Sequence, residues 1–263
     1  MKISRIRPVY FSPTSTSRKI VEAIAEGFSS IKTADPVDLT YPGVSAVSEV
    51  GGDELAIIAV PVYAGRVAPL AAERLRTIRG GLGPAVVVVL YGNRDYEDAL
   101  IELRDIANGL SFVTIAGGAF IGEHSFSSQT VPLAPGRPDE NDLAVAKDFG
   151  SRVDALLDVG IGNGLLEVPG NVPYKKRMGK IPATPQFNGQ MCSECGFCVD
   201  LCPAGAILFD GQVSVDEEAC IFCCSCVKNC PEGAVAVTAP LVRKKIAWLY
   251  ENCAARKEPE LFY

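Results

Sequence analysis

Several features that define membrane or secreted proteins are missing from this sequence of 263 residues. No stretch approaches the roughly 20 uninterrupted apolar residues that a membrane-spanning helix needs. The longest apolar run, Ala85 to Leu90, has only the length of a strand. The basic residues near the N-terminus are not followed by an apolar block and a small-residue cleavage site, so no secretory signal is visible. We therefore expect a cytoplasmic protein without a membrane span.

The chain also has fewer basic than acidic residues. The chain has 25 Lys and Arg residues against 31 Asp and Glu residues, whereas nucleic-acid binding needs a basic face. We therefore expect no nucleic-acid partner. The imbalance is greatest in residues 185–240, which hold seven acidic residues and a single base, Lys228. Residues 173–184 hold four bases and no acid, which favours a solvated linker; the alternative is a basic segment that lies on an acidic surface, its own or a partner's.

Cysteine is absent from the first 191 residues and abundant after them. Nine of the ten cysteines fall within 39 residues, from Cys192 to Cys230. A secreted disulfide framework would spread its bridges over the fold. Such dense clustering in a chain without a secretory signal indicates a metal site instead.

The first 160 residues alternate between strand-like and helix-like patterns. Apolar segments predict strands over 5–11, 37–39, 55–60, 85–91 and 112–120. Helical spacing of apolar residues predicts helices over 17–28, 69–78, 96–107 and 139–157. Five strands interleaved with helices predict an α/β domain, a doubly wound parallel sheet covered on both faces. Ligands of such sheets bind in the loops beyond the carboxyl ends of the strands, here 12–17, 61–66, 91–96 and 117–128.

The pattern changes after residue 160. We divide the chain into the α/β domain over 1–160, a linker rich in glycine and proline over 161–185, a cysteine-rich domain over 186–240 and a C-terminal helix or tail over 241–263. The cysteine-rich domain is a short internal repeat that is too small to bury a core of its own. Metal clusters must supply the missing stability, and the C-terminal helix is expected to pack onto the first domain.

Both halves of the repeat follow the pattern C-x2-C-x2-C-x3-C-P. The first copy begins at Cys192 and the second at Cys220. This spacing suits a cubane of four irons and four sulfurs, because three thiolates of one loop hold three irons while the fourth cysteine points to the other cluster. A tetrahedral zinc ion needs neither a third cysteine at this spacing nor a remote fourth one, so two complete copies with both prolines favour clusters.

The repeat resembles the two-cluster bacterial ferredoxins, which have an α+β fold. The resemblance implies that cluster one is held by Cys192, Cys195, Cys198 and Cys230, and cluster two by Cys220, Cys223, Cys226 and Cys202. Cys224 lies between ligands, either as a small apolar residue that shields the cluster or as a ligand in place of Cys223 or Cys226. Cys253 is expected to be a buried bystander.

The first loop of the α/β domain is rich in hydroxyl groups. Between a strand and a helix it carries Ser12, Thr14, Ser15, Thr16 and Ser17. Free amides and the helix dipole at this position suit a phosphate dianion. A single N-cap would need only one of these hydroxyls. The loop lacks the glycines of a P-loop or a dinucleotide fingerprint, so one phosphate of a mononucleotide is the ligand that fits.

This loop resembles the phosphate loop of flavodoxins, which reads Ser/Thr-x-Thr-Gly-x-Thr. Ser12, Thr14 and Ser17 match the pattern, and Ser15 stands where glycine is usual. The resemblance implies an FMN cofactor whose ring lies between two further loops. Tyr63 or Tyr96 is then expected to stack on that ring, although either can be a plain rim residue. The expected contacts in these loops are Pro61, Val62, Tyr63, Ala64, Gly65, Tyr91, Gly92, Asn93, Arg94 and Tyr96.

Nearly the whole chain resembles the fused flavodoxin–ferredoxin proteins of the family called EFR1, found mainly in anaerobes. The segments "FSPT", "PVYAGR", "YGNR", "GGAFIGEHSF" and "GRPDENDLA" carry this resemblance. The single histidine, His124, follows the last predicted strand. It is either a loop residue that caps backbone groups or a catalytic proton donor to a reduced flavin or a substrate.

These features predict an oxidoreductase that transfers electrons between a low-potential donor and FMN through two four-iron, four-sulfur clusters. One alternative is a flavin-dependent reductase of a small organic acceptor such as a quinone or an enone. Another is a non-catalytic electron carrier or sensor subunit of a larger redox complex. The partner is accordingly a redox protein or a small-molecule acceptor, and homodimer formation stays open.

Overall fold

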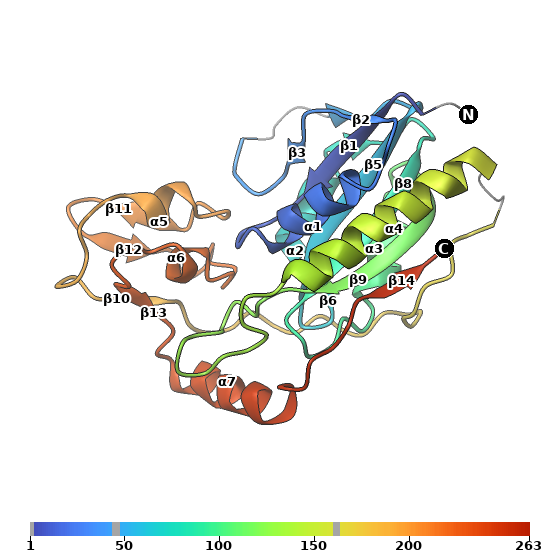
Figure 1. Ribbon diagram of the computed structural model, residues 1–263. Coiled ribbons are helices and arrows are strands. Elements are labelled where there is room, and N and C mark those ends of the chain that lie inside the picture. Colours follow the sequence, from blue (N-terminus) through green and yellow to red (C-terminus); the bar gives the residue numbers. More distant parts are fainter. Residues whose placement is uncertain (1–2, 44–47, 160–163) are drawn as a thin grey trace.

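The computed structural model describes residues 3–43, 48–159 and 164–263 (Figure 1). An α/β domain forms one lobe and a cysteine-rich domain the other, with a long helix beneath both. The predicted domain boundary after residue 160 lies outside the described residues. Among the described helices, none is both long and apolar enough to cross a membrane.

Four long parallel strands form the centre of the sheet. They are β1 (Arg5–Tyr10), β5 (Glu54–Tyr63), β8 (Pro84–Tyr91) and β9 (Val113–Ile121). Two short segments, β2 (Lys32–Thr33) and β3 (Val37–Asp38), both pair with the outer side of β1. Counting β2 and β3 as one interrupted strand, the order along the sheet is 2-1-3-4-5, which is the flavodoxin-like doubly wound topology. The predicted fold class is confirmed.

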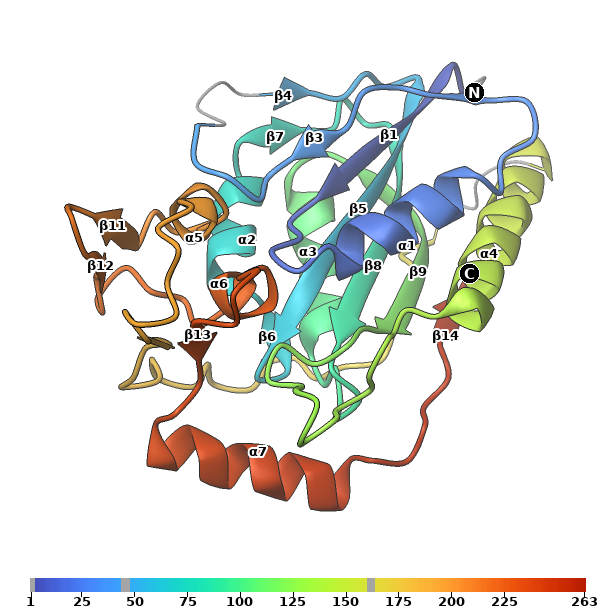
Figure 2. The same ribbon diagram turned by 60° about the vertical axis from the view of Figure 1, so that its left-hand side comes forward.

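Helices cover both faces of this sheet, as Figure 2 shows. Helices α1 (Thr16–Ala25) and α4 (Glu140–Val159) cover one face, and α2 (Pro69–Leu75) and α3 (Ala99–Gly109) cover the other. The central strands β5 and β8 are apolar at successive positions because both of their faces are buried. Val87 and Val89 join the core on one side, whereas Val86 and Val88 join the core on the other.

Several boundaries differ from the prediction. The helix predicted over 69–78 ends at Leu75, because residues Ile78–Arg79 form β7 against β4 (Ser48–Glu49). The helix predicted from residue 96 begins at Ala99. The β5 strand continues past the predicted residue 60 and turns back as β6 (Arg66–Val67).

The C-terminal segment differs most from the prediction. Helix α7 spans Pro240–Asn252, so a helix over the whole of 241–263 is wrong. Residues Glu260–Phe262 form β14, which pairs antiparallel with β9 at the edge of the sheet. A strand of three residues is too short to show a period of two, which is why the sequence pattern did not indicate it.

The cysteine-rich domain keeps the symmetry of its repeat. Each half has a one-turn helix, α5 (Phe197–Asp200) or α6 (Ser225–Lys228). The first half is followed by the hairpin of β11 (Ile207–Phe209) and β12 (Val213–Val215). The second half ends in β13 (Val235–Ala236), which pairs with β10 (Gln186–Phe187). The pairing of β10 with β13 therefore brings the beginning and the end of the repeat together.

The basic segment before this domain is not a solvated linker. The Tyr174 hydroxyl donates to Asp105 at 2.5 Å, and the Arg177 guanidinium donates to Glu102 at 2.5 Å. Lys175 forms an ion pair with Glu97. These three residues bind the acidic groups of α3 and of the loop before it, so the alternative prediction of a basic segment on an acidic surface of its own chain holds here.

Helices α1 and α4 cross at two glycines. A Cβ atom on Gly150 would lie 2.0 Å from the carbonyl oxygen of Ile24, and one on Gly27 would lie 2.2 Å from that of Lys147. The Ser151 hydroxyl donates to the Gly27 carbonyl at 2.8 Å across the same crossing. The two backbones therefore touch without space for a methyl group.

We expect Gly150→Ala to lower the free energy of unfolding by about 1–3 kcal/mol, since the added methyl forces the helices apart. Gly109→Ala is the matched control, because no atom lies within 4 Å of its Cβ position. The control should be neutral or slightly stabilising through its effect on the unfolded chain. Chemical denaturation measures both, and equal effects of the two substitutions would contradict the close crossing.

Candidate functional site

Two cavities in the cysteine-rich domain are lined by the cysteines of the two runs. The first cavity is lined by Cys192, Cys195, Cys198 and Cys230. The second is lined by Cys202, Cys220, Cys223, Cys224 and Cys226. Apart from Cys224, each cavity is lined by three cysteines of one run and the last cysteine of the other, which is the crossed arrangement that the ferredoxin resemblance implies. Among the described residues, no three His, Cys, Asp or Glu side chains converge closely enough to hold a single metal ion.

Backbone amides point at the fourth cysteine of each run. The Ala206 amide donates to Cys202 Sγ at 3.2 Å, and the Ala234 amide donates to Cys230 Sγ at 3.3 Å. Both contacts arise from the Gly-Ala turn that follows the Cys-Pro pair of each run, so the repeat reproduces the same local geometry twice. Such hydrogen bonds stabilise negative charge on sulfur and help to set the potential of a bound cluster.

The second cavity lies against the carboxyl end of the sheet. Ile221 packs onto the core of the α/β domain, and the Phe222 ring meets the Phe126 ring edge-on at 5.6 Å between centroids. Burial, followed by the nearby thiols of Cys223 and Cys224, raises the pKa of Tyr63 well above its usual value. Tyr63, in the predicted flavin loop, and Ile221, which lines the second cavity, both pack against the core of the α/β domain.

Two polar contacts hold the domains together at the same interface. The Arg74 guanidinium donates to the Pro203 carbonyl at 2.6 Å. Lys228 donates to Glu123 at 2.6 Å and to the Ser127 carbonyl at 2.7 Å. The only base of residues 185–240 is thus turned toward the α/β domain. The hydrogen bonds of Arg74 and Lys228 thus hold the region of the second cavity against the α/β domain.

Cys224 occupies the repeat position of Gly196. Both residues precede a one-turn helix in the left-handed region, with φ of 60° for Cys224 and 80° for Gly196. A residue with a Cβ is strained in this region. Burial raises the pKa of the Cys224 thiol well above its usual value, so it stays protonated. Its side chain packs beside Phe222 and Val242, which fits the prediction of a small residue that shields the cavity.

The hydroxyl-rich loop between β1 and α1 has unused donors. Ser12 serves as the cap, since its hydroxyl accepts from the Arg18 amide at 3.0 Å. The amides of Thr14, Thr16 and Ser17 donate to no acceptor among the described residues. The Ser17 hydroxyl is fully buried and has no partner there either. Buried polar groups without a partner destabilise the fold. The free donors of this loop therefore suit an anion, which would pair with them.

The backbone conformation of this loop shows how a serine fits at position 15, where the flavodoxin pattern has glycine. Ser15 has φ of 64°, the left-handed conformation in which glycine is favoured. The loop keeps the glycine-like turn with a serine in it. No acidic residue lies in the first turn of α1, so the positive end of the helix dipole is free to act on an anion.

The loop over 61–65 turns tightly beneath the second cavity. Ala64 and Gly65 have positive φ of 53° and 81°. A Cβ on Gly65 would lie 1.7 Å from a carboxylate oxygen of Glu97. Pro61 and Val62 continue β5 up to this turn. The turn places Gly65 against Glu97, and the Gly65 carbonyl accepts from the Asp98 amide at 3.0 Å.

The loop over 91–96 is held by the C-terminal tail. The buried Asn93 side chain donates to the carbonyls of Cys253 and Ala255 at 2.6 and 2.8 Å, and accepts from the Lys257 amide at 3.3 Å. The Tyr96 hydroxyl donates to Glu260 at 2.8 Å. We call these contacts the C-terminal clasp.

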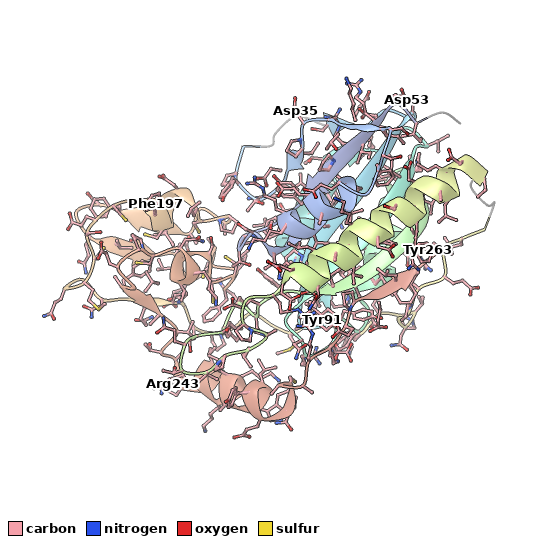
Figure 3. The ribbon with its side chains drawn as sticks, viewed as in Figure 1. Asp35, Asp53, Tyr91, Phe197, Arg243 and Tyr263 are labelled. Carbon is pink, nitrogen blue, oxygen red and sulfur yellow. The ribbon has the colours of Figure 1, made fainter. Side chains whose placement is uncertain are left out.

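The C-terminal clasp affects which of the two predicted tyrosines, Tyr63 or Tyr96, is available to stack on a flavin ring. Tyr96 is buried against Tyr91, with 5.4 Å between ring centroids, and its hydroxyl is bound by Glu260. Figure 3 shows Tyr91 at the end of the sheet that faces this tail. Of the two predicted stacking residues, Tyr63 alone lies at the interface with the cysteine-rich domain. Sequence patterns did not reveal the clasp, since its partners lie about 160 residues apart.

Two arginines near these loops are already paired. Arg66 binds Glu102 through two hydrogen bonds of 2.7 and 2.9 Å and stacks over Tyr174. Arg94 donates to Glu97 at 2.7 Å. Both guanidiniums neutralise carboxylates of their own domain, so their cationic groups serve the loop structure in this arrangement.

His124 packs directly on Gly92. A Cβ on Gly92 would lie 2.3 Å from the His124 ring. His124 Nδ1 accepts from the Phe126 amide at 3.0 Å, which leaves any ring proton on Nε2. Burial, assisted by the positive charges of Lys228, Arg94 and Lys245, lowers the pKa of His124 to about 4. The imidazole is therefore neutral near pH 7, which disfavours a cationic proton donor.

Comparisons with known proteins agree with this division of the chain. Residues 191–234 match the family described as "4Fe-4S dicluster domain". No curated protein sequence matches the chain. A flavodoxin from the domain Archaea aligns with 57% of this chain and 96% of its own, at 11% identity and a TM-score of 0.38.

Two further solved structures align with the α/β domain. A flavodoxin of Streptococcus pneumoniae TIGR4 shares 16% identity over 58% of this chain and 99% of its own, at a TM-score of 0.38. The rubredoxin oxygen:oxidoreductase of Desulfovibrio gigas shares 15% identity over 60% of this chain, at a TM-score of 0.44. The match covers 37% of that oxidoreductase. The chain therefore combines a sheet of flavodoxin-like strand order with a matched 4Fe-4S dicluster domain.

We expect His124 to contribute a pH-dependent part of the stability. Its pKa near 4 in the folded state lies below the value of about 6.5 in the unfolded chain. The unfolded state therefore binds more protons between these values, and stability falls as the pH is lowered from 6.5 toward 4.

Chemical denaturation of the wild type and of His124→Gln across this range measures the effect. The difference in free energy of unfolding between the two proteins should shift in favour of His124→Gln as the pH falls. A difference that stays constant with pH would show that His124 titrates normally in the folded protein.

Proposed function

We propose that this chain is an iron–sulfur flavoprotein that transfers electrons between a low-potential donor and FMN by way of two four-iron, four-sulfur clusters. The supporting observation is the interface at Tyr63. There Tyr63, in the loop predicted to bind the flavin ring, packs against the same core as Ile221 of the second cavity and lies within electrostatic reach of Cys223 and Cys224. A metal site and a flavin site that share one buried interface are best explained by electron transfer between them.

The cysteines fit clusters better than other metal sites. Cys192, Cys195, Cys198 and Cys230 would hold one cluster, and Cys202, Cys220, Cys223 and Cys226 the other. Each set lines a cavity rather than converging on one point. Burial raises the pKa of the Cys223 thiol to about 12 when no metal is bound, so cluster binding must displace its proton.

The loop over 12–17 fits the phosphate of FMN. The free amides of Thr14, Thr16 and Ser17 and the unpaired Ser17 hydroxyl are donors that a phosphate dianion can satisfy. The hydroxyls of Thr14, Ser15 and Thr16 would add further donors. Tyr63, Gly65, Gly92 and Asn93 would border the ring, with Asn93 held in place by the C-terminal clasp.

Bound FMN accepts two electrons in single steps while each cluster carries one, so the pairing joins one-electron to two-electron chemistry. The chain's own residues keep water out of the contact between the sites. Phe126, Phe222 and Val242 form an apolar cluster there. The ion pair of Lys228 with Glu123 closes its polar side.

The alternative of a reductase acting on a small organic acceptor has less support. It relies on His124 as the proton donor, and the imidazole is neutral with Nδ1 occupied by the Phe126 amide. A role as electron carrier for a larger complex uses the same sites as the main proposal. We therefore place the activity in electron transfer.

Anaerobically purified protein should contain about eight irons and about one FMN per chain, from two four-iron clusters and one phosphate loop. Cys202→Ala and Cys230→Ala should each lose about four irons, whereas Cys224→Ala should keep about eight. Stopped-flow spectra with a limiting reductant should show slower flavin reduction in Cys202→Ala than in the wild type.

About four irons in the wild type, or loss of iron in Cys224→Ala, would contradict the assigned ligands. Flavin that is reduced at the same rate in Cys202→Ala and in the wild type would contradict transfer through the second cavity. Absence of flavin from intact, iron-loaded protein would overturn the FMN site.

We expect Ser17→Ala to weaken FMN binding about tenfold, the loss of one hydrogen bond to a charged group. The free energy of unfolding of the flavin-free protein should be unchanged or raised, because the hydroxyl has no partner in the fold. Ser29→Ala is the control, since its hydroxyl lies beyond the opposite end of α1 and binds Asp154. Equal FMN affinity of the two variants, measured by fluorescence titration, would exclude Ser17 from the phosphate site.

A further inference from the structure

The two cysteine-lined cavities differ in their exposure. In the first cavity Cys195 is exposed, and Cys192, Cys198 and Cys230 are half-buried. In the second cavity Cys202, Cys223 and Cys226 are buried and Cys220 is half-buried. The first cavity is therefore the more accessible of the two to a partner outside the molecule.

The first cavity also lies on the outer side of the molecule. Figure 3 shows Phe197, which lines this cavity, on the outer lobe, far from Tyr91 at the end of the sheet. The second cavity instead contacts the α/β domain through Ile221 and Phe222. The first cavity is thus the distal one with respect to the predicted flavin loops.

Apolar side chains surround the distal cavity and are left open. Met191, Phe197 and Phe209 are 49%, 53% and 46% exposed, and the last two line the cavity itself. A group of exposed large apolar side chains on a small domain marks an interaction site. We call Met191, Glu194, Phe197, Phe209 and Glu232 the port face.

The charge around the port face has one sign. Glu194 and Glu232 line the distal cavity and are exposed. Asp200, the last residue of α5, and Asp210, which follows β11, are exposed as well. The only base of residues 185–240, Lys228, is bound to Glu123 and Ser127 on the opposite side of the domain. No lysine or arginine of this segment therefore offsets the acidic groups on the outer side.

We propose that the port face docks an external redox protein that presents basic residues around its own redox centre. This inference rests on the proposed function. The step is a one-electron transfer in which the partner's centre loses one electron and the group held by Cys192, Cys195, Cys198 and Cys230 gains it. No bond forms or breaks and no proton moves. The apolar centre excludes water, and the acidic rim orients the basic partner.

Cytochrome c, a basic redox protein, is a suitable probe for the holoprotein. The port variant Glu194→Lys/Glu232→Lys should weaken its binding at low salt by about tenfold or more, because like charges then face each other across the interface. Asp148→Lys/Asp158→Lys is the control, with the same change of net charge on α4. The control should lose less than about threefold, since charges beyond a Debye length are screened. Isothermal calorimetry measures both affinities without turnover.

A second measurement compares small oxidants of opposite charge. For the reduced wild type, the rate ratio of cationic hexaamminecobalt(III) to anionic EDTA–cobalt(III) should fall as salt rises. The port variant should lower this ratio, and the control should leave it unchanged. Asp200→Lys/Glu232→Lys replaces the port variant if the substitution at residue 194 prevents cluster loading.

The outcomes separate this proposal from the proposed function. Equal cytochrome c affinity of the port and control variants, in protein that keeps its iron and flavin, would overturn the port face alone. Loss of flavin or iron from the wild type would overturn the proposed function instead. Self-association of the wild type at low salt that the port variant abolishes would assign the face to a second copy, whose α7 carries Arg243, Lys244 and Lys245, and would overturn the basic redox partner.

Discussion

The packing of the Ile221–Cys224 segment onto the carboxyl end of the sheet is the constraint on which the two-domain arrangement depends. Ile221 packs onto the core of the α/β domain, and Phe222 meets Phe126. The left-handed conformation of Cys224 is shared by Gly196, so it belongs to the cysteine run itself and not to this packing. The same packing makes one cysteine-lined cavity more buried than the other. It therefore gives the molecule an inner and an outer cavity from a nearly symmetric sequence repeat.

The cysteine-rich domain shows why such a repeat needs its metal. Its apolar core consists mainly of cysteines and short aliphatic side chains around Ile207 and Val235, and its helices have a single turn each. A domain of this size buries too little apolar surface to fold alone. Contacts with the α/β domain and the bonds to the clusters must together hold it. The arrangement makes the inner side of the domain, with Lys228 and Phe222, a structural surface and leaves the outer side free for recognition.

Strong local patterns made much of this molecule predictable. The apolar runs of β1, β5, β8 and β9 and the stripes of α1 and α4 identified the sheet and its layers, and the resemblance of the cysteine runs to ferredoxins implied which cysteines line a common cavity. Contacts between distant segments left no such pattern. The clasp on Asn93, the ion pairs of Lys175 with Glu97 and of Arg177 with Glu102, and the position of Tyr63 near the cysteines depend on how separate elements meet. The role of Ser12 as the cap, rather than the adjacent hydroxyls, depends on the backbone turn at Ser15.

The pairing of β14 with β9 has a consequence for how the protein is made. Because residues Glu260–Phe262 return to the sheet that β1 begins, the cysteine-rich domain is an insertion in the α/β domain rather than an appendage to it. One cut in either connection would leave the two parts joined through the other. During synthesis the edge of β9 stays uncovered until residues 260–262 have left the ribosome, and an open edge strand can pair with other chains. Completion of the sheet, and with it the clasp on Asn93, must therefore wait until the cysteine runs have been translated.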